Sequence, residues 1–310
     1  MLEVPGAVAA NGIDAPVAAH YGSFNGEQLT LVAGDGFVDL SHRDVLRVAG
    51  PDRLTWLHSI STQFFEGLQA GHQVTALILS PQGHVEHAFT GVDDGEAFTA
   101  HTEPGAGAPL VAYLERMKFM TRVEITDESA GLAVTWRPVG SDSGKFDLVP
   151  RDQLTAYAGA AGPACGVWAY DALRIARGEP RFHQDTDHRT IPNEVGWIDT
   201  AVHMDKGCYR GQETVARVHN LGRPPRRLTL LHLDGSENLL PQVGSDLRLV
   251  DKVVGRVGTS ARHHELGPIA LGLVKRNVPL DAELDAGGLP AAQEVIVDPE
   301  IGRHFRPLKG

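Results

Sequence analysis

A segment near residue 208 combines a thiol, a cation and glycines in a pattern that suits chemistry. Cys208 follows Lys206 by two positions, just before a helix that the sequence predicts over 211–219. A positive charge near a thiol, at a helix N-terminus, lowers the thiol pKa and increases the fraction of reactive thiolate. Two interpretations remain open: Cys208 works as a thiolate tuned by Lys206, or it is a small buried residue in a tight loop.

The residues beside this pair are expected to shape the loop. Its glycines permit unusual backbone angles and the close approach of another molecule. The polar side chains that follow could satisfy free amides of the first helical turn, in the manner of a capping box. The loop residues predicted to act with Lys206 and Cys208 are Gly207, Tyr209, Gly211, Gln212 and Glu213.

A second cluster carries residue types that bind metals. His183, Asp185, Asp187 and His188 lie within six consecutive positions and could reach one ion. No predicted helix or cysteine accompanies them, so the sequence favours a solvated loop whose side chains bond the local backbone. We therefore expect no metal site here.

A basic run follows the cysteine segment. These cations could bind a carboxylate tail or a phosphate group. Alternatively, it is a linker whose charges pair with nearby glutamates. The run consists of Arg217, Arg223, Arg226 and Arg227, with His219 among them.

Two residue pairs elsewhere invite a functional interpretation. Glu86 and His87 are a possible acid–base pair on a predicted strand, where only one of them can face a given cavity. Trp168 and Tyr170 lie in a predicted helix over 167–177 and could stack on a planar ligand, although aromatic residues at such positions are often core.

Apolar periodicity and turn signals predict an α+β chain with antiparallel sheets. The first 35 or so residues show no clear period and are expected to be a loose lead-in. Residues 74–79 and 84–91 form a predicted hairpin, and a helix is expected after Asp52. Further strands are predicted at 45–48, 97–101, 122–126, 132–136 and 146–149, and further helices at 109–119 and 151–157.

The pattern changes in the second half of the chain. Residues 178–207 form a long irregular segment, which in a compact domain is usually functional. After a glycine–proline boundary at 222–225, short alternating strands separated by glycine-rich turns predict a small all-β barrel. These strands are expected at 228–233, 246–249, 253–259 and 269–274.

Composition narrows the class of protein. Lys and Arg number 28 and Asp and Glu 39, so the net charge of −11 argues against direct nucleic-acid or anionic-membrane binding. Two cysteines cannot build a disulfide framework or a four-cysteine metal site. The N-terminal segment lacks the cations of a signal peptide, and we expect a cytoplasmic protein without a membrane span.

The run from Lys206 to Glu213 closely resembles the signature of the YgfZ family, Lys-Gly-Cys-aromatic-x-Gly-Gln-Glu. That family belongs to the folate-binding, aminomethyltransferase-like superfamily named after the glycine cleavage T protein. Softer matches follow the same order over about residues 43–227, at Val48–Gly50, Gln82–Val85, Leu173–Ile175 and Ile191–Pro192.

The resemblance implies a three-domain fold. Its first domain would be discontinuous, over 1–49 and 128–225; its second would be an α+β unit over 50–127; and its third a C-terminal β-barrel over 226–310. Tetrahydrofolate, or a one-carbon derivative, would bind in a central cavity. The residues expected near it are Trp168, Tyr170, Arg174 and Arg217.

The resemblance also implies a function. The chain would be an accessory protein rather than an enzyme, supporting assembly or repair of iron–sulfur proteins, notably [4Fe–4S] enzymes, with an indirect effect on tRNA modification. Its partners would be iron–sulfur client or assembly proteins. The alternative is a tetrahydrofolate-dependent aminomethyl or one-carbon transferase, in which Glu86 acts on the amine.

Two departures from the superfamily bear on that choice. Aminomethyltransferases carry two aspartates where this chain has Glu86 and His87, which argues against glycine-cleavage chemistry. The superfamily also holds the pterin with a glutamate where this chain has Ala176. The lost charged hydrogen bond is worth about 1.5–3 kcal/mol, so folate would be anchored differently or more weakly.

Overall fold

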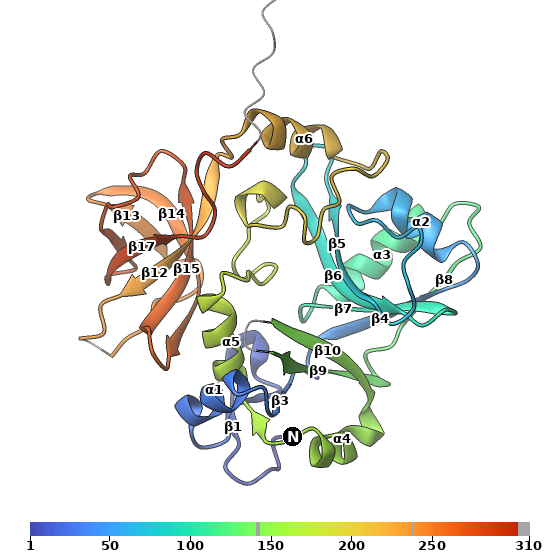
Figure 1. The fold of residues 1–310 in the computed structure, drawn as a ribbon, viewed down its shortest axis with the longest axis horizontal. Coiled ribbons are helices and arrows are strands. Elements are labelled where there is room, and N and C mark those ends of the chain that lie inside the picture. The colour runs from blue at the N-terminus through green and yellow to red at the C-terminus, as the bar shows by residue number, and fades with distance from the viewer. Residues whose placement is uncertain (141–142, 237, 303–310) are drawn as a thin grey trace, which may run out of the picture.

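The computed structural model describes residues 1–140, 143–236 and 238–302. Its sheets and barrel are arranged as a ring, with the segment after α5 running through the middle (Figure 1). The α+β fold with antiparallel sheets and a C-terminal barrel, predicted from the sequence, is confirmed.

A five-stranded antiparallel sheet forms one side of the ring. Its order is β5–β6–β7–β4–β8, and helices α2 and α3 cover one face with an apolar core that includes Trp56, Phe98 and Leu110. The predicted hairpin is β5 with β6. The elements are β4 (Asp44–Ala49), α2 (Arg53–Ile60), β5 (Gln73–Leu79), β6 (Val85–Asp93), β7 (Ala97–Thr102), α3 (Gly107–Met117) and β8 (Glu124–Asp127).

A four-stranded sheet forms the base of the ring. Its order is β10–β9–β3–β11, with β11 parallel to β3, and it packs against α1 and α5. The elements are β1 (Val8–Ala9), η1 (Gly12–Asp14), β2 (Ala18–His20), α1 (Phe24–Val32), β3 (Phe37–Asp39), β9 (Leu132–Val139), β10 (Ser143–Pro150), η2 (Arg151–Gln153), α4 (Leu154–Ala160), β11 (Ala164–Cys165) and α5 (Val167–Ala176).

The expectation of a loose N-terminal lead-in is wrong. Helix α1 is part of this base, and its buried residues are Glu27, Gln28 and Leu31. The Glu27 carboxylate accepts hydrogen bonds from the backbone amides of Tyr21 and Gly166 at 2.7 and 2.8 Å. Because α1 is fixed by buried polar side chains, it has no apolar stripe for a periodicity argument to detect.

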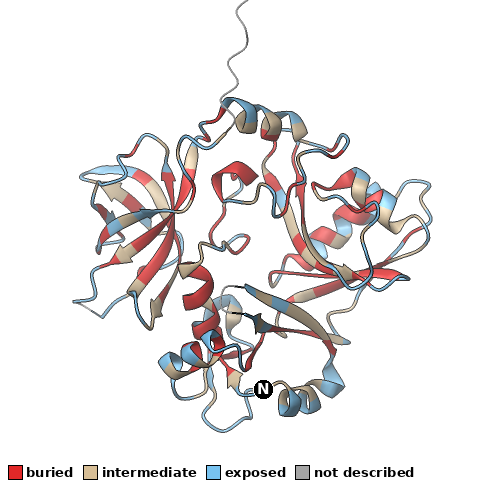
Figure 2. Cartoon of the chain, in the orientation of Figure 1, coloured by how far each residue is buried: buried red, intermediate tan, exposed pale blue. Residues whose placement is uncertain are grey.

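The C-terminal unit is a closed barrel of order β12–β15–β14–β13–β16–β17. Helix α5 packs against its outside, where Ala172 and Ile175 contact apolar barrel residues, and Figure 2 shows α5 as buried along most of its length. The strands are β12 (Arg226–Leu233), β13 (Asp246–Leu249), β14 (Lys252–His263), β15 (Gly267–Lys275), β16 (Leu284–Ala286) and β17 (Pro290–Val295). The last two were not predicted.

The long segment between α5 and α6 (Gln212–Leu221) alternates between buried and exposed stretches, and its one helix is the short η3 (Pro192–Glu194). Phe182, Ala201 and Val202 pack with Leu77 and Leu79 of β5. The segment therefore joins the sheet to the centre of the ring. No helix in the described part of the chain is long and apolar enough to cross a bilayer.

The predicted domain boundaries stay predictions. Strand β4, placed before the 49/50 boundary, pairs with β7 and β8 of the following unit.

Candidate functional site

The loop around Cys208 alternates between buried anchors and exposed residues. Lys206 and Tyr209 are 5% and 8% exposed, whereas Gly207 and Cys208 are exposed. The interpretation of Cys208 as a small buried residue is therefore wrong. The loop presents the thiol to solvent between two fixed side chains.

The ammonium group of Lys206 is held by backbone carbonyls at the C-terminal end of α2. It donates hydrogen bonds to the carbonyl oxygens of His58, Ser61 (2.5 Å) and Gln63 (3.0 Å). These carbonyls lie where the helix dipole favours a cation. Burial lowers the pKa of Lys206 to about 8. Lys206 thus ties the Cys208 loop to α2, a role that its spacing from the thiol did not reveal.

Gly211 fixes the far end of the loop against the β5–β6 turn. Its φ is +81°, and a Cβ there would lie 2.5 Å from the carbonyl oxygen of Ser80. Only glycine tolerates both the left-handed conformation and this approach. The expected capping by Gln212 and Glu213 is wrong: Gly211 is the N-cap of α6, and neither side chain makes a hydrogen bond within the described residues.

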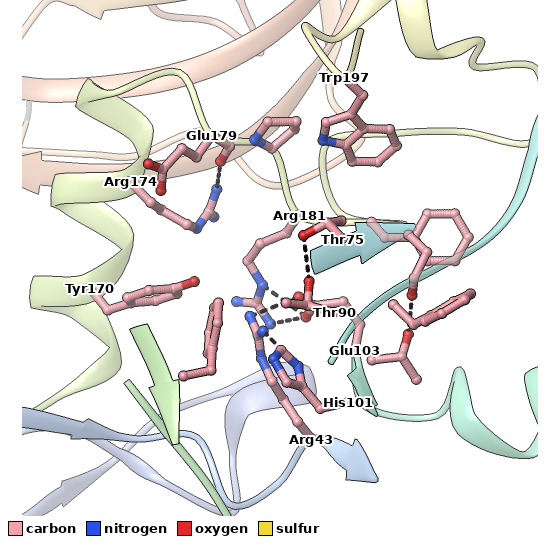
Figure 3. Close-up of a pocket in the computed structure, with 16 residues that line it drawn as sticks. Arg43, Thr75, Thr90, His101, Glu103, Tyr170, Arg174, Glu179, Arg181 and Trp197 are labelled. Atoms are coloured by element: carbon pink, nitrogen blue, oxygen red, sulfur yellow. Dashed lines mark hydrogen bonds and ion pairs between the residues drawn. The ribbon is translucent and has the colours of Figure 1, made fainter. Parts of the chain in front are cut away.

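A cavity of about 210 Å³ lies in the centre of the ring, and a second, of about 350 Å³, adjoins it. Figure 3 shows the first, with side chains converging from the sheets, α5 and the central segment. Aromatic rings and arginines dominate its wall. Five residues line both cavities: Thr75, Thr90, Phe146, Tyr170 and Glu179.

Buried ion pairs form one wall of the central cavity. The Glu103 carboxylate forms ion pairs with Arg43 at 2.9 Å and with Arg181 at 2.7 Å. Arg181 also pairs with Asp14 at 2.8 Å. Burial acts to raise the pKa of Glu103, but the two guanidinium groups outweigh it and lower the pKa to about 2. Glu103 is therefore ionised, and the wall combines fixed charges of both signs.

Two buried hydrogen-bond donors in this cavity have no partner among the residues that the structure describes. His101 lies within 3.4 Å of Arg43 through Nδ1, which must accept because a guanidinium only donates. Burial, then the charge of Arg43, holds the pKa of His101 well below its usual value, so the neutral ring carries its proton on Nε2. His101 Nε2 and Arg43 Nε are both buried, and neither has a hydrogen-bond partner in the described part of the chain. Buried unpaired donors are costly, and a ligand with acceptors would satisfy them.

The sequence did not single out Arg43, His101, Glu103 or Arg181. The sequence did contain a signal for the contact between Arg43 and Glu103, because each residue lies close to a predicted strand. Strands β4 and β7 are antiparallel with Asp44 opposite Thr102, so Arg43 and Glu103 follow as the next pair in register. Opposite charges at this position indicate a contact across the sheet.

The four residues expected near folate do not gather at one place. Tyr170 lines the central cavity, and its hydroxyl makes no hydrogen bond to a described residue. Trp168, on the other side of α5, lines a different cavity and lies 5.2 Å from the ring of His20. Arg217 is exposed on α6 and lines none of these cavities.

Arg174 lines the central cavity, and each of its three side-chain nitrogens donates to a neighbour. It binds Asp171 at 2.6 Å, Asp185 at 3.1 Å and the hydroxyl of Thr259 at 2.7 Å. It also donates to the carbonyl oxygen of Glu179 at 2.9 Å. Arg174 therefore links α5, the central segment and the barrel, and this network fixes one edge of the cavity.

The expectation that the His and Asp cluster bonds the local backbone is confirmed for its aspartates: Asp185 and Asp187 accept from the amides of Arg181 and Arg189 at 2.7 and 2.9 Å. His183 and His188 are exposed, and the aspartates also have distant partners. Asp185 is 2% exposed and accepts from the backbone amide of Thr259 at 2.6 Å as well as from Arg174. Asp187 binds Arg226 at 2.6 Å. No group of three metal-type ligands assembles anywhere in the described residues.

The basic run divides among separate structural roles. Arg226 is neutralised by Asp187 and by Glu194 at 2.8 Å, and Arg223 pairs with Glu300. Arg227 is fully buried, with a hydrogen bond to Gln293 at 2.7 Å. For Arg223 and Arg226, the interpretation as cations that pair with nearby acids is confirmed.

Glu86 and His87 have different surroundings, as strand alternation predicts. Glu86 is exposed and pairs with Arg210 of the Cys208 loop at 3.2 Å, and it does not line the central cavity. The ring of His87 lies 5.4 Å from that of Tyr113, and burial lowers the pKa of His87 to about 4.

Ala176 stands where the superfamily has its pterin-binding glutamate. It packs against the apolar cluster between α5 and the barrel.

No protein-family model matches the chain. Over 306 residues it is 25% identical to "Putative transferase At1g60990, chloroplastic" of Arabidopsis thaliana, a match that covers 82% of this chain and 69% of that protein. It is 23% identical to the mitochondrial iron–sulfur cluster assembly factor IBA57 homologue of Mycosarcoma maydis, over 61% of this chain and 55% of that protein. A shorter match, 37% identical over 76 residues, covers 24% of this chain and 23% of the tRNA-modifying protein YgfZ of Buchnera aphidicola.

Among solved structures, the chain resembles the aminomethyltransferase T of the glycine cleavage system from Bartonella henselae. The TM-score is 0.77 at 15% identity, and the alignment covers 98% of this chain and 97% of the other. The chain therefore has the aminomethyltransferase fold. Its relatives include aminomethyltransferases, IBA57 and YgfZ, which confirms the resemblance stated from Lys206–Glu213.

Proposed function

We propose that this chain binds a reduced folate in the central cavity and supports the assembly or repair of iron–sulfur proteins through the exposed Cys208. The observation that carries the proposal is the loop itself, in which two buried anchors hold an exposed thiol. Two relatives, named as an iron–sulfur cluster assembly factor and as YgfZ, support the proposed role in iron–sulfur protein assembly.

The central cavity suits a flat heteroaromatic ligand. Tyr170, Phe146 and Trp197 offer aromatic faces, and the unpartnered donors of His101 and Arg43 would meet acceptors on its rim. Glu179 lines both adjoining cavities. Its half-exposed carboxylate, which already accepts from Arg177 at 2.8 and 2.9 Å, would also accept from the ligand's amino groups, in place of the carboxylate missing at Ala176. A bound tetrahydrofolate would supply a carrier for one-carbon units.

Cys208 would contact an iron–sulfur client or assembly protein directly. An exposed thiolate is a soft ligand and a good nucleophile, whereas a buried thiol is inert. Cys165 is such an inert thiol: it is 1% exposed, and burial raises its pKa to about 12. The two cysteines of this chain therefore form a natural test pair.

A second candidate is a tetrahydrofolate-dependent aminomethyl or one-carbon transferase. The fold and the Arabidopsis relative favour it. The position of Glu86, exposed and paired with Arg210 outside the central cavity, does not support its proposed action on the amine. An aminomethyl-donor assay with tetrahydrofolate separates the two functions.

The iron–sulfur role is tested by complementation. In a strain lacking the gene, at equal soluble expression, Cys165→Ser should restore the activity of several [4Fe–4S] enzymes and Cys208→Ser should not. Full rescue by Cys208→Ser would contradict the thiolate role.

The folate site is tested separately by titration calorimetry with tetrahydrofolate. Tyr170→Leu should weaken binding by about tenfold, while Trp168→Leu, on the same helix but facing another cavity, should not. Equal loss in both variants, or no binding at millimolar folate, would contradict the assignment.

A further inference from the structure

A cleft between the barrel and α6 is separate from the central cavity. Its volume is about 610 Å³, within the range of small-ligand sites. The β5–β6 turn, α6, the end of the central segment and strands β14 and β15 contribute to its wall. In Figure 1 these elements meet where α6 bridges the barrel and the five-stranded sheet.

The charges in this cleft do not balance. Its two acids, Asp187 and Glu194, are both bound to Arg226. Three further cations line it, and none forms an ion pair with a described residue. Arg256 donates to the carbonyl oxygen of Thr186 at 2.7 Å, Lys275 donates to that of Val253 at 3.0 Å, and the exposed side chain of Arg189 makes no hydrogen bond within the described chain.

This excess of positive charge stands out in a protein of net charge −11. Cations that meet only carbonyls keep their full charge for a ligand, and a cleft lined by one sign of charge concentrates the opposite ion. The cations come from the central segment, β14 and β15, so they are distributed along the cleft. Separated cations match separated anions better than they match one compact anion.

Much of the remaining lining is aliphatic. Val218, Val253 and Leu273 lie in the wall, and among the described residues that line it only His84 has an aromatic ring on which a base could stack. Nucleic-acid bases and nucleotides are therefore a poor match. A chain that carries carboxylates on aliphatic carbons fits both parts of the wall.

We propose that this cleft binds an aliphatic oligocarboxylate, with Arg189, Arg256 and Lys275 as its charge partners. The cleft also borders the candidate site: Thr214 lines it, and a Cβ on Gly83 of the β5–β6 turn would lie 2.7 Å from Thr214 Cβ. A bound chain would therefore rest against the helix that begins directly after the Cys208 loop. The proposal does not depend on folate binding.

The test is titration calorimetry of the full chain with tetraglutamate in two linkages, at low salt and at 0.3 M salt. The α-linked form represents an acidic peptide and the γ-linked form a γ-glutamyl chain, so the tighter binder identifies the source. Binding should weaken at the higher salt because the ions screen the charges. Arg189→Gln and Lys275→Gln should each reduce affinity by about fivefold, the upper end for exposed ion pairs.

The control is Lys145→Gln, which removes one positive charge from β10, outside the cleft. It should leave affinity unchanged. An equal loss of affinity in all three variants would overturn the proposed site. So would the absence of binding of either tetraglutamate at millimolar concentration. Tripolyphosphate binding as tightly as tetraglutamate, with the same loss in Arg189→Gln and Lys275→Gln, would overturn the assignment to carboxylates.

Discussion

The ammonium group of Lys206 lies 5.2 Å from the centre of the Tyr209 ring, and these two buried residues flank the exposed thiol of Cys208. Lys206 is fixed on α2 and Tyr209 in the apolar cluster beneath the β5–β6 hairpin. The contact is a cation–π interaction between the two anchors. It explains how a four-residue segment can hold a cysteine at the surface in a defined position.

We expect the two cysteines to differ sharply in reactivity. In the native protein, Ellman's reagent at pH 8 should modify one thiol within minutes, and Cys208→Ser should abolish that fast phase. Cys165 should react only after denaturant is added, because it is buried and its pKa is raised to about 12. Two thiols reacting at equal rates in native protein would contradict the structure of the loop.

Replacing Lys206 tests whether it anchors the loop. Lys206→Met leaves the carbonyls of Ser61 and Gln63 without their donor, which should lower the free energy of unfolding by about 1–3 kcal/mol in urea titrations. An unchanged free energy of unfolding in Lys206→Met would contradict the anchoring role.

The ion pairs in the central cavity should be sensitive to the loss of one partner. Arg181→Met leaves Glu103 and Asp14 without a shared cation, and breaking a buried pair costs about 3–5 kcal/mol. The matched control is Arg248→Met, whose exposed pair with Asp246 is worth at most about 1 kcal/mol. Similar unfolding midpoints for both variants would show that the buried pairs contribute little.

Stability should fall as the pH drops from about 7 to 5. The unfolded chain protonates its histidines near pH 6.5, whereas burial holds the pKa of His101 well below that value in the folded state. Because the unfolded state then binds more protons, lowering the pH favours unfolding by up to about 1.4 kcal/mol per pH unit for each such histidine. His87, with a pKa of about 4, adds to the effect.

This pH dependence is measured by urea titration at several pH values. His101→Gln should flatten it, and His203→Gln, at an exposed position, should not. A slope unaffected by His101→Gln would assign the pH dependence to other groups.

The sequence determined the regular elements and the motif. The alternating runs of β5, β6 and the first four barrel strands, and the apolar stripe of α3, were predicted close to their observed bounds, because local periodicity reflects which face is buried. The segment Lys206–Glu213 was recognised because its residue types are unusual in combination. Helix α1 was missed because Glu27 and Gln28 are buried on it, and burial of polar groups depends on partners distant in sequence, such as Gly166.

The tertiary structure alone decided the environment of each side chain. It turned Lys206 toward α2 and exposed Cys208, although the two residues are neighbours in sequence. It placed Trp168 and Tyr170 beside different cavities, and it brought Arg181 to Glu103 across 78 positions. The physical reason is that charge, burial and hydrogen bonding depend on distance in space, and the chain closes into a ring that joins segments with no local sequence signal between them (Figure 1).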